Sequence, residues 1–164
     1  GKMECVLRPL ALPEVAQEVC QFFEAKAAQQ GVMIENRLSA GPLVMADADR
    51  VRQVLVNLVA NGLKFTAKGG QIWIAGEQFR DGGARWTEVT VGDTGRGMSE
   101  ADRVRLFQPF TQGRNVEDGV AGHKGTGLGL YIVKSIVDQH GGKIEVKSTL
   151  GQGTQISFSL RVAA

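Results

Sequence analysis

One amphipathic stretch, residues 53–66 (QVLVNLVANGLKFT), constrains the fold of this chain more than any other. Its apolar residues, together with Val51 just before it, recur three and four positions apart and so line one face of a helix. Asn57, Asn61 and Lys64 recur at the same spacing and form a second, polar ridge. A solvated face opposite a core face is the ordinary interpretation of such a ridge. Two amides and an ammonium in one row also have the chemistry to hold a metal ion and a phosphate chain.

The composition is that of a globular protein and excludes several classes of function. Of 164 residues, 43% are apolar and 22% charged, so we expect one domain spanning residues 1–164. The formal net charge of +2 is too small to indicate a nucleic acid partner. Cys5 and Cys20 form no CxxC pair, and with His123 and His140 they lack zinc-ligand spacing. We find no signal peptide and no apolar run near the roughly 20 residues that span a bilayer, so we expect a cytoplasmic segment without membrane contact.

Hydrophobic periodicity predicts helices before, between and after strands. The helices are expected over residues 13–30, from an N-cap at Asp47 to Thr66, from an N-cap at Ser99 to Phe107, and over 128–140. The strands are expected over residues 5–10, 32–38, 43–46, 71–79, 85–91, 143–148 and 154–162, with a hairpin turn at Asp81-Gly82-Gly83. Residues 111–124 lack periodicity and are expected to form a lid-like loop. This order predicts an α/β two-layer sandwich, a mixed and mostly antiparallel sheet with helices on one face.

Two glycine-rich motifs follow the organising helix. Asp93, within GDTGRGM at residues 92–98, directly follows a strand, where a carboxylate can accept a hydrogen bond from an exocyclic amine such as that of adenine. A plain Asp-Gly turn is the alternative. The second motif, GTGLGL at residues 125–130, is expected to open a helix, where closely spaced glycines free backbone N–H groups for an anion. The motif is not a Walker loop, because no GK[ST] occurs in the sequence. It is not a GxGxxG fingerprint either, because Leu130 stands where the third glycine would be.

Taken in order, Asn61, the Asp93-x-Gly95-x-Gly97 motif and the glycine run at residues 125–129 resemble the ATP-binding catalytic domain of sensor histidine kinases, members of the Bergerat-fold superfamily. The resemblance extends from about residue 8 to residue 162 and includes the LFQPF box at residues 106–110. It implies a domain that binds Mg-ATP and donates the γ-phosphoryl group to a histidine in two-component signal transduction.

The resemblance also implies roles for individual residues. Asn61 would coordinate Mg²⁺ with Asn57 lining the same site, and Lys64 would reach toward phosphate. Asp93 would bind the adenine amino group, with Gly95 and Gly97 shaping the base pocket. Phe107 and Phe110 would anchor the base of the lid, which spans about residues 111–125. Gly125, Gly127 and Gly129 would hinge the lid and present amides to the phosphates, with Thr126 and Leu128 in the same nucleotide-binding run. Lys124 is a further phosphate candidate on charge and position alone.

Asn57 bears on the mechanism that the resemblance implies. In the hydrolysing relatives of the superfamily, a Glu four residues before the metal-binding Asn acts as the base for water. An amide at that position cannot usefully accept a proton. We therefore expect phosphoryl transfer to a positioned nucleophile, with catalysis mostly by placement and charge neutralisation, and a slow intrinsic ATPase activity. Gly62, where the family usually has alanine, is expected to loosen the helix slightly.

The chain has no histidine in the setting of a phosphoryl acceptor. His123 falls in the expected lid, and His140 falls at a helix end, where a cation is ordinary. We therefore expect the acceptor histidine on a separate dimerisation domain, N-terminal in a homodimeric parent, and no autophosphorylation by this chain alone. A response regulator or receiver domain is the second expected partner. Gln108 and the Thr111-Gln112 pair look more like hybrid kinases, and the resemblance leaves open a parent anchored in the inner membrane.

Two alternatives remain open at this stage. The domain could be a degenerate nucleotide sensor or a docking module for a response regulator, although Asn61, Asp93 and the glycines argue against degeneracy. A serine kinase of the same superfamily is the other, but such kinases keep the Glu that Asn57 replaces.

Overall fold

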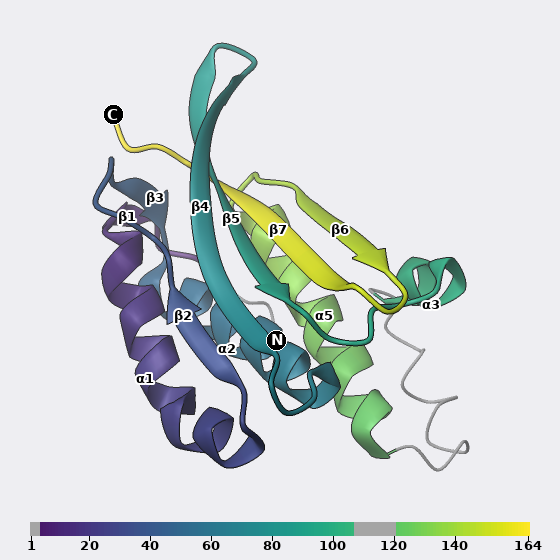
Figure 1. The fold of residues 1–164 in the computed structure, drawn as a ribbon. Coiled ribbons are helices and arrows are strands. Elements are labelled where there is room, and N and C mark those ends of the chain that lie inside the picture. The colour runs from purple at the N-terminus through teal and green to yellow at the C-terminus, as the bar shows by residue number, and fades with distance from the viewer. Residues whose placement is uncertain (1–3, 107–120) are drawn as a thin grey trace.

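The computed structural model describes residues 4–106 and 121–164, and for residues 121–129 it describes the backbone only. Seven strands and four helices follow one another in the described chain, and Figure 1 shows their arrangement. The helices are α1 (Leu12–Gln30), α2 (Ala48–Phe65), α3 (Glu100–Arg105) and α5 (Ala121–Gln139). The strands are β1 (Arg8–Leu10), β2 (Met33–Asn36), β3 (Val44–Ala46), β4 (Gln71–Asp81), β5 (Ala84–Asp93), β6 (Ile144–Thr149) and β7 (Gly153–Arg161).

A five-stranded sheet with the order β2-β4-β5-β7-β6 forms one layer of the molecule. Only β2 and β4 run parallel, and every other neighbouring pair is antiparallel. Helices α1, α2 and α5 all cover the same face of this sheet (Figure 1). The predicted two-layer sandwich with a mixed, mostly antiparallel sheet is therefore confirmed.

The core lies between the sheet and these three helices. Strand alternation sends every second side chain inward, and Ile72, Val89 and Phe158 are almost fully buried there. The apolar face of α2 meets them, with Leu55 and Leu58 equally buried. The polar ridge of α2 lies beside this apolar face, with Asn61 buried, Asn57 half-buried and Lys64 exposed.

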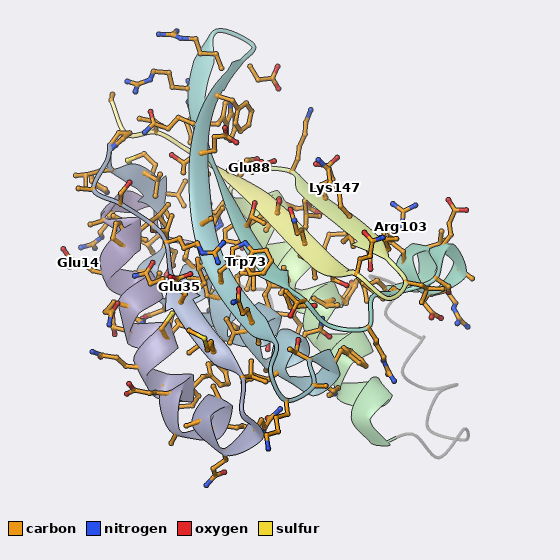
Figure 2. The ribbon with its side chains drawn as sticks, viewed as in Figure 1. Glu14, Glu35, Trp73, Glu88, Arg103 and Lys147 are labelled. Carbon is orange, nitrogen blue, oxygen red and sulfur yellow. The ribbon has the colours of Figure 1, made fainter. Side chains whose placement is uncertain are left out.

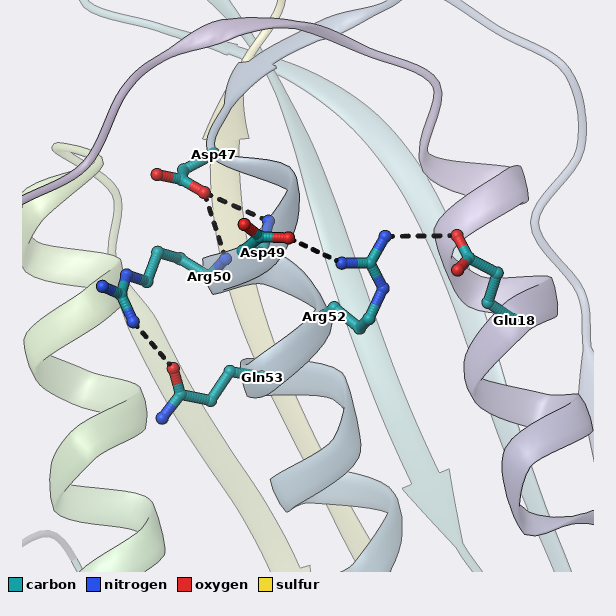
Figure 3. A network of polar contacts seen from close by, with 6 residues as sticks. All are labelled: Glu18, Asp47, Asp49, Arg50, Arg52 and Gln53. Atoms are coloured by element: carbon teal, nitrogen blue, oxygen red, sulfur yellow. Dashed lines mark hydrogen bonds and ion pairs between the residues drawn. The ribbon is translucent and has the colours of Figure 1, made fainter.

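The start of α2 is held by Asp47, as the sequence predicts. Its Oδ1 accepts hydrogen bonds from the backbone N–H groups of Asp49 (3.1 Å) and Arg50 (3.2 Å), two donors that a helix start leaves unpaired. Arg52, one turn later, lies between Asp49 and Glu18 of α1 and forms ion pairs with both (Figure 3). The first turns of α2 are thus capped and tied to α1.

His140 directly follows the last residue of α5, as expected, and its ring is buried there. Only 6% of its surface is exposed, and its Nε2 accepts a hydrogen bond from the backbone N–H of Asp47 at 3.1 Å. Its Nδ1 lies 2.8 Å from the carbonyl oxygen of Ile136 and donates to it. Both ring nitrogens are thereby engaged, because the start of α2 folds back over the end of α5.

The start of α5 is the main difference from the predicted elements. The helix begins at Ala121, not at residue 128, so residues 121–124 of the expected lid are helical. Extending a helix adds one hydrogen bond for each residue fixed, whereas only its nucleation is costly, and the packed part after Leu130 supplies the nucleus. The rest of the expected lid, residues 111–120, lies outside the described residues, as do Phe107 and Phe110. None of the described helices is long and apolar enough to cross a membrane.

Candidate functional site

The candidate site forms where the end of α2 meets the end of β5. Asn61 and Gly62 lie in the last turns of α2, and Asp93 is the last residue of β5. A Cβ atom placed on Gly62 would lie 3.5 Å from Oδ2 of Asp93, so the carboxylate lies directly against this turn of α2. The structure thus brings together the polar ridge and the first glycine motif, which are about thirty residues apart in sequence.

Asp93 is a buried carboxylate with few partners. Only 8% of its surface is exposed, and its Oδ1 accepts a hydrogen bond of 2.8 Å from the backbone N–H of Gly95. Burial raises the pKa of the Asp93 carboxyl above its usual range, and the backbone N–H groups of Gly95 and Thr154 oppose that shift. A further donor that reached this carboxylate would offset part of the cost of burying its charge.

The loop after Asp93 needs its two glycines. A Cβ atom on Gly95 would lie 2.5 Å from the carbonyl oxygen of Phe65, and one on Gly97 would lie 2.1 Å from that of Thr149. Gly97 also has a φ of +73°, which L side chains rarely adopt. The backbone N–H of Arg96 donates to the carbonyl oxygen of Phe65 (3.2 Å), and the carbonyl oxygen of Arg96 accepts from the N–H of Gly151 (2.7 Å). These two hydrogen bonds hold the same loop in place. The predicted shaping role of these glycines thus has a steric basis.

Asn61 has the one buried side-chain oxygen on α2 that lacks a partner in the described part of the chain. The residue is 7% exposed, and no hydrogen bond reaches its Oδ1. An orphaned amide oxygen in a buried setting is suited to a hard cation such as Mg²⁺. Asn57 lies one turn earlier and is half-buried, so it can line the same position. No group of three or more His, Cys, Asp or Glu side chains with metal-binding geometry occurs among the described residues.

An open hollow of about 470 Å³ lies beside the end of α2. Lys64 lines it, and burial, together with the charge of Lys26 on α1, lowers the pKa of the Lys64 ammonium. The guanidinium of Arg96 lies 4.6 Å from the centre of the Phe65 ring. Sequence reasoning missed five of the lining residues, namely Phe65, Thr66, Ala67, Thr94 and Arg96. Of these, Phe65 carried a visible signal, because it is an aromatic residue directly after Lys64.

The second glycine motif lies in the first turns of α5 rather than before them. Residues 125–129 are helical, and only the first four N–H groups of a helix lack an intrahelical partner. The side chains of Lys124, Thr126 and Leu128 lie outside what the structure describes. α5 packs alongside α2, so the glycine run and Asn61 belong to neighbouring helices. The contacts of this run with phosphate stay a prediction.

Comparison with known proteins gives one consistent result. The family described as histidine kinase-, DNA gyrase B-, and HSP90-like ATPase matches residues 46–164. The chain is 35% identical over 162 residues to the non-motile and phage-resistance protein of Caulobacter vibrioides, covering 99% of the chain and 19% of that protein. It is 37% identical to the histidine protein kinase DivJ of the same organism, covering 91% of the chain and 24% of DivJ. The chain thus spans about a quarter or less of these relatives.

Solved structures agree with this comparison. Full-length ShkA in complex with AMPPNP matches with a TM-score of 0.81 at 30% identity, covering 100% of this chain and 33% of ShkA. The nucleotide-free catalytic domain of the histidine kinase ThkA matches with a TM-score of 0.78 at 30% identity, covering 98% of this chain and 97% of that domain. The fold around the site is therefore that of these catalytic domains.

Proposed function

The chain belongs to the family of histidine kinase-, DNA gyrase B-, and HSP90-like ATPases and is an ATP-binding domain of the histidine kinase class, and from that premise we propose that it binds Mg-ATP and donates the γ-phosphoryl group to a histidine on a separate dimerisation domain. The single observation that carries this proposal is the contact of Asp93 with the Asn61-Gly62 turn of α2. This contact would bring the proposed adenine acceptor, Asp93, next to the proposed magnesium ligand, Asn61.

Asp93 is the proposed acceptor for the exocyclic amine of adenine. Its Oδ1 is already engaged by the Gly95 N–H, so the remaining oxygen, on the side of Gly62, is the one that the amine would meet. A hydrogen bond to a charged, buried acceptor is worth about 1.5–3 kcal/mol. The glycines at 95 and 97 keep the loop close enough to Phe65 for a flat ring to lie in the adjoining hollow.

Asn61 is the proposed protein ligand of the magnesium ion, and its orphaned Oδ1 supports the fit. Mg²⁺ would supply charge neutralisation to the phosphates when bound, taking its other ligands from phosphate oxygens and water. Asn57 would support the same position from one turn earlier. Lys64, whose ammonium is disfavoured by burial and by Lys26, would gain from an approaching phosphate.

The chemistry that these residues support is transfer rather than hydrolysis. Asn57 stands where a hydrolase of this superfamily would have its Glu, and an amide gives no base to activate water. Lys64 and Asn61 can position and neutralise the phosphate chain, which is most of what phosphoryl transfer requires. The intrinsic ATPase activity of the chain should accordingly be slow.

The acceptor is proposed to be a histidine outside this chain. His140 is buried with both ring nitrogens engaged, so it offers no free nitrogen to a phosphoryl group. His123 belongs to the part of α5 whose side chains are not described. The acceptor would lie on the dimerisation domain of a homodimeric parent, with a response regulator or receiver domain receiving the phosphoryl group next.

The experiment that tests the proposal mixes this chain with γ-labelled ATP and the separately produced dimerisation domain of its parent. The expected product is an acid-labile, base-stable label on that domain and none on this chain. At an ATP concentration below saturation the Asp93→Asn variant should transfer label much more slowly, and a His140→Gln variant should transfer it normally. Label on this chain alone, or fast release of inorganic phosphate without the acceptor domain, would refute the assignment.

A further inference from the structure

The face of the sheet that the helices leave open has a groove of about 320 Å³ over β7. Its floor is made by Ser157 and Ser159, the small outward-facing residues of β7, which alternate with the buried Ile156, Phe158 and Leu160. β5 lies on one side of the floor and β6 on the other. Neither Asn61 nor Asp93 lines this groove, so it is separate from the proposed nucleotide site.

Unpaired carboxylates stand on both sides of the groove. Glu88 on β5 is opposite Ser159, and Glu145 on β6 is opposite Ser157. Neither forms an ion pair with another side chain in the part of the molecule that the structure describes. Figure 2 shows Glu88 on the open face of the sheet. The groove therefore presents negative charge on a chain whose formal net charge is +2.

Basic side chains are near these two carboxylates, with Lys143 and Lys147 on either side of Glu145 on β6, but none forms an ion pair with them in the described part of the chain. Glu77 on β4 is directly opposite Glu88, an arrangement of like charges that costs stability. Lys143 lines the groove, but its Nζ lies 3.9 Å from Asp81 at the rim. Arg161 is opposite Trp86 and is exposed, with no ion pair to Glu88 among the described contacts. An excess of negative charge is thus maintained around the floor.

Two aromatic side chains complete the wall on the side of β5. Phe79 and Trp86 are directly opposite each other on β4 and β5, and 39% of Phe79 is exposed. The indole N–H of Trp86 is buried and has no hydrogen-bond partner in the described chain. An aromatic face beside carboxylates is the environment that a guanidinium group prefers, because it can stack and form forked hydrogen bonds at once.

The same sheet face already holds one such cluster with its arginine present. The guanidinium of Arg37 lies 4.8 Å from the centre of the Trp73 ring and forms an ion pair with Glu35. Glu35 is on β2, directly opposite Trp73 on β4. Trp86 and Glu88 repeat this combination of a tryptophan and a glutamate on β5, but among the described contacts no guanidinium stacks on Trp86 or pairs with Glu88, although Arg161 is opposite Trp86. Figure 2 shows Trp73, Glu35 and Glu88 on this one face.

We propose that the groove of Trp86, Glu88 and Glu145 binds an arginine side chain from an extended segment of a protein partner. The unpaired carboxylates match the guanidinium, and the aromatic rings match its flat face. A polyamine carries ammonium groups but no flat guanidinium that can stack on the rings and form forked hydrogen bonds, so an arginine fits the groove better. The groove is thus a docking site for a basic partner segment, beyond the phosphoryl transfer proposed above.

The test uses the two indole N–H signals of the ¹⁵N-labelled chain, which has two tryptophans. The probe is the peptide acetyl-Gly-Gly-Arg-Gly-Gly-amide, and its matched control carries citrulline, which has the shape of arginine without the charge. The arginine peptide should move the Trp86 signal saturably, with a dissociation constant of about 1 mM. The Trp73 signal, whose ring is already covered by Arg37, should stay in place.

Variants separate this site from general charge effects. The double variant Glu88→Gln with Glu145→Gln should weaken peptide binding about tenfold, while Glu14→Gln on α1 should leave it unchanged. ATP affinity should be the same in all three proteins, so a negative result here would leave the proposed kinase function standing. The proposal is overturned if the arginine peptide leaves the Trp86 signal unmoved, if citrulline moves it equally, or if spermidine does.

Discussion

Oδ2 of Asp93 lies 3.5 Å from the point that a Cβ atom on Gly62 would occupy, so the end of β5 and the last turns of α2 touch at this pair. The contact places the proposed base-binding carboxylate beside the turn that carries Asn61. A side chain added at Gly62 would therefore meet the Asp93 carboxylate directly.

Gly62→Ala should stabilise the chain without harming nucleotide binding. Alanine gains about 1 kcal/mol over glycine inside a helix. The new Cβ would meet Cδ1 of Ile72 at 3.3 Å, which is tight, but that atom is the end of a flexible side chain. Urea denaturation of the variant should show a higher midpoint, and Ala60→Gly on the exposed side of α2 should show the opposite change. A lower midpoint for Gly62→Ala would mean that Ile72 cannot move.

Asp93→Asn should separate stability from function. Because burial raises the pKa of Asp93, the folded state disfavours the charged form. The wild type therefore loses stability as the pH rises from the unfolded pKa through the raised folded pKa, and the loss is complete above both. The amide variant lacks this loss and should be at least as stable at neutral pH. Its ATP affinity should fall roughly ten- to a hundredfold, the value of a hydrogen bond to a charged acceptor.

The measurement pairs thermal unfolding from pH 3 to 8 with ATP titration of the same two proteins. The melting temperatures should diverge in favour of the variant as the pH rises and then keep a constant difference. A variant that unfolds more easily at neutral pH would show that the Asp93 charge supports the fold, contrary to its burial.

Asp47→Ala should lower the free energy of unfolding by about 1 kcal/mol because the cap of α2 is lost. A further loss of stability is expected because the Val6 N–H, which donates to Oδ2 of Asp47 at 2.9 Å, loses its acceptor. That hydrogen bond is the main reason that the pKa of Asp47 is lowered. Its stabilisation is present above the unfolded pKa and is lost as the pH falls through the folded pKa. Asp47→Asn keeps an acceptor, so its unfolding free energy should depend less on pH between about 5 and 2. If the unfolding free energies of the wild type and Asp47→Asn fell equally between these pH values, the Asp47 carboxylate would not have this stabilising role.

Gly97→Ala should be far more damaging than a glycine substitution at a similar φ elsewhere. Gly97 and Gly141 have φ values of +73° and +74°, but only at Gly97 would a Cβ atom strike backbone, at 2.1 Å from the Thr149 oxygen. We expect a loss of about 1 kcal/mol for Gly141→Ala, from strain alone, and about 2–4 kcal/mol for Gly97→Ala. Chemical denaturation of both variants checks the difference, and similar losses would show that the loop at 97 can shift.

Local signals in the sequence were enough to predict most of the helices and strands. The caps at Asp47 and Ser99 both form as expected, since each is a side chain bonding its own neighbouring backbone. The hairpin turn forms at Gly82 and Gly83, both with positive φ. Asp93 and Asn61 were also predicted from the order of motifs, and the structure places them in adjoining elements.

Features that depend on contacts between distant segments were not predictable from local patterns. The Arg96 guanidinium lies over Phe65 only because the loop after β5 folds onto the end of α2. The buried state of His140 depends on Asp47, 93 residues away in sequence. The start of α5 was predicted too late because glycines weaken a helix without stopping one that is already nucleated.

The most direct test of the central claim is a calorimetric titration of the chain with ATP, with and without Mg²⁺, beside Asn61→Ala. We expect the wild type to bind ATP more tightly with Mg²⁺ and the variant to bind equally in both conditions, because its orphaned metal ligand is gone. The same magnesium dependence in both proteins, or no binding by the wild type, would contradict the account.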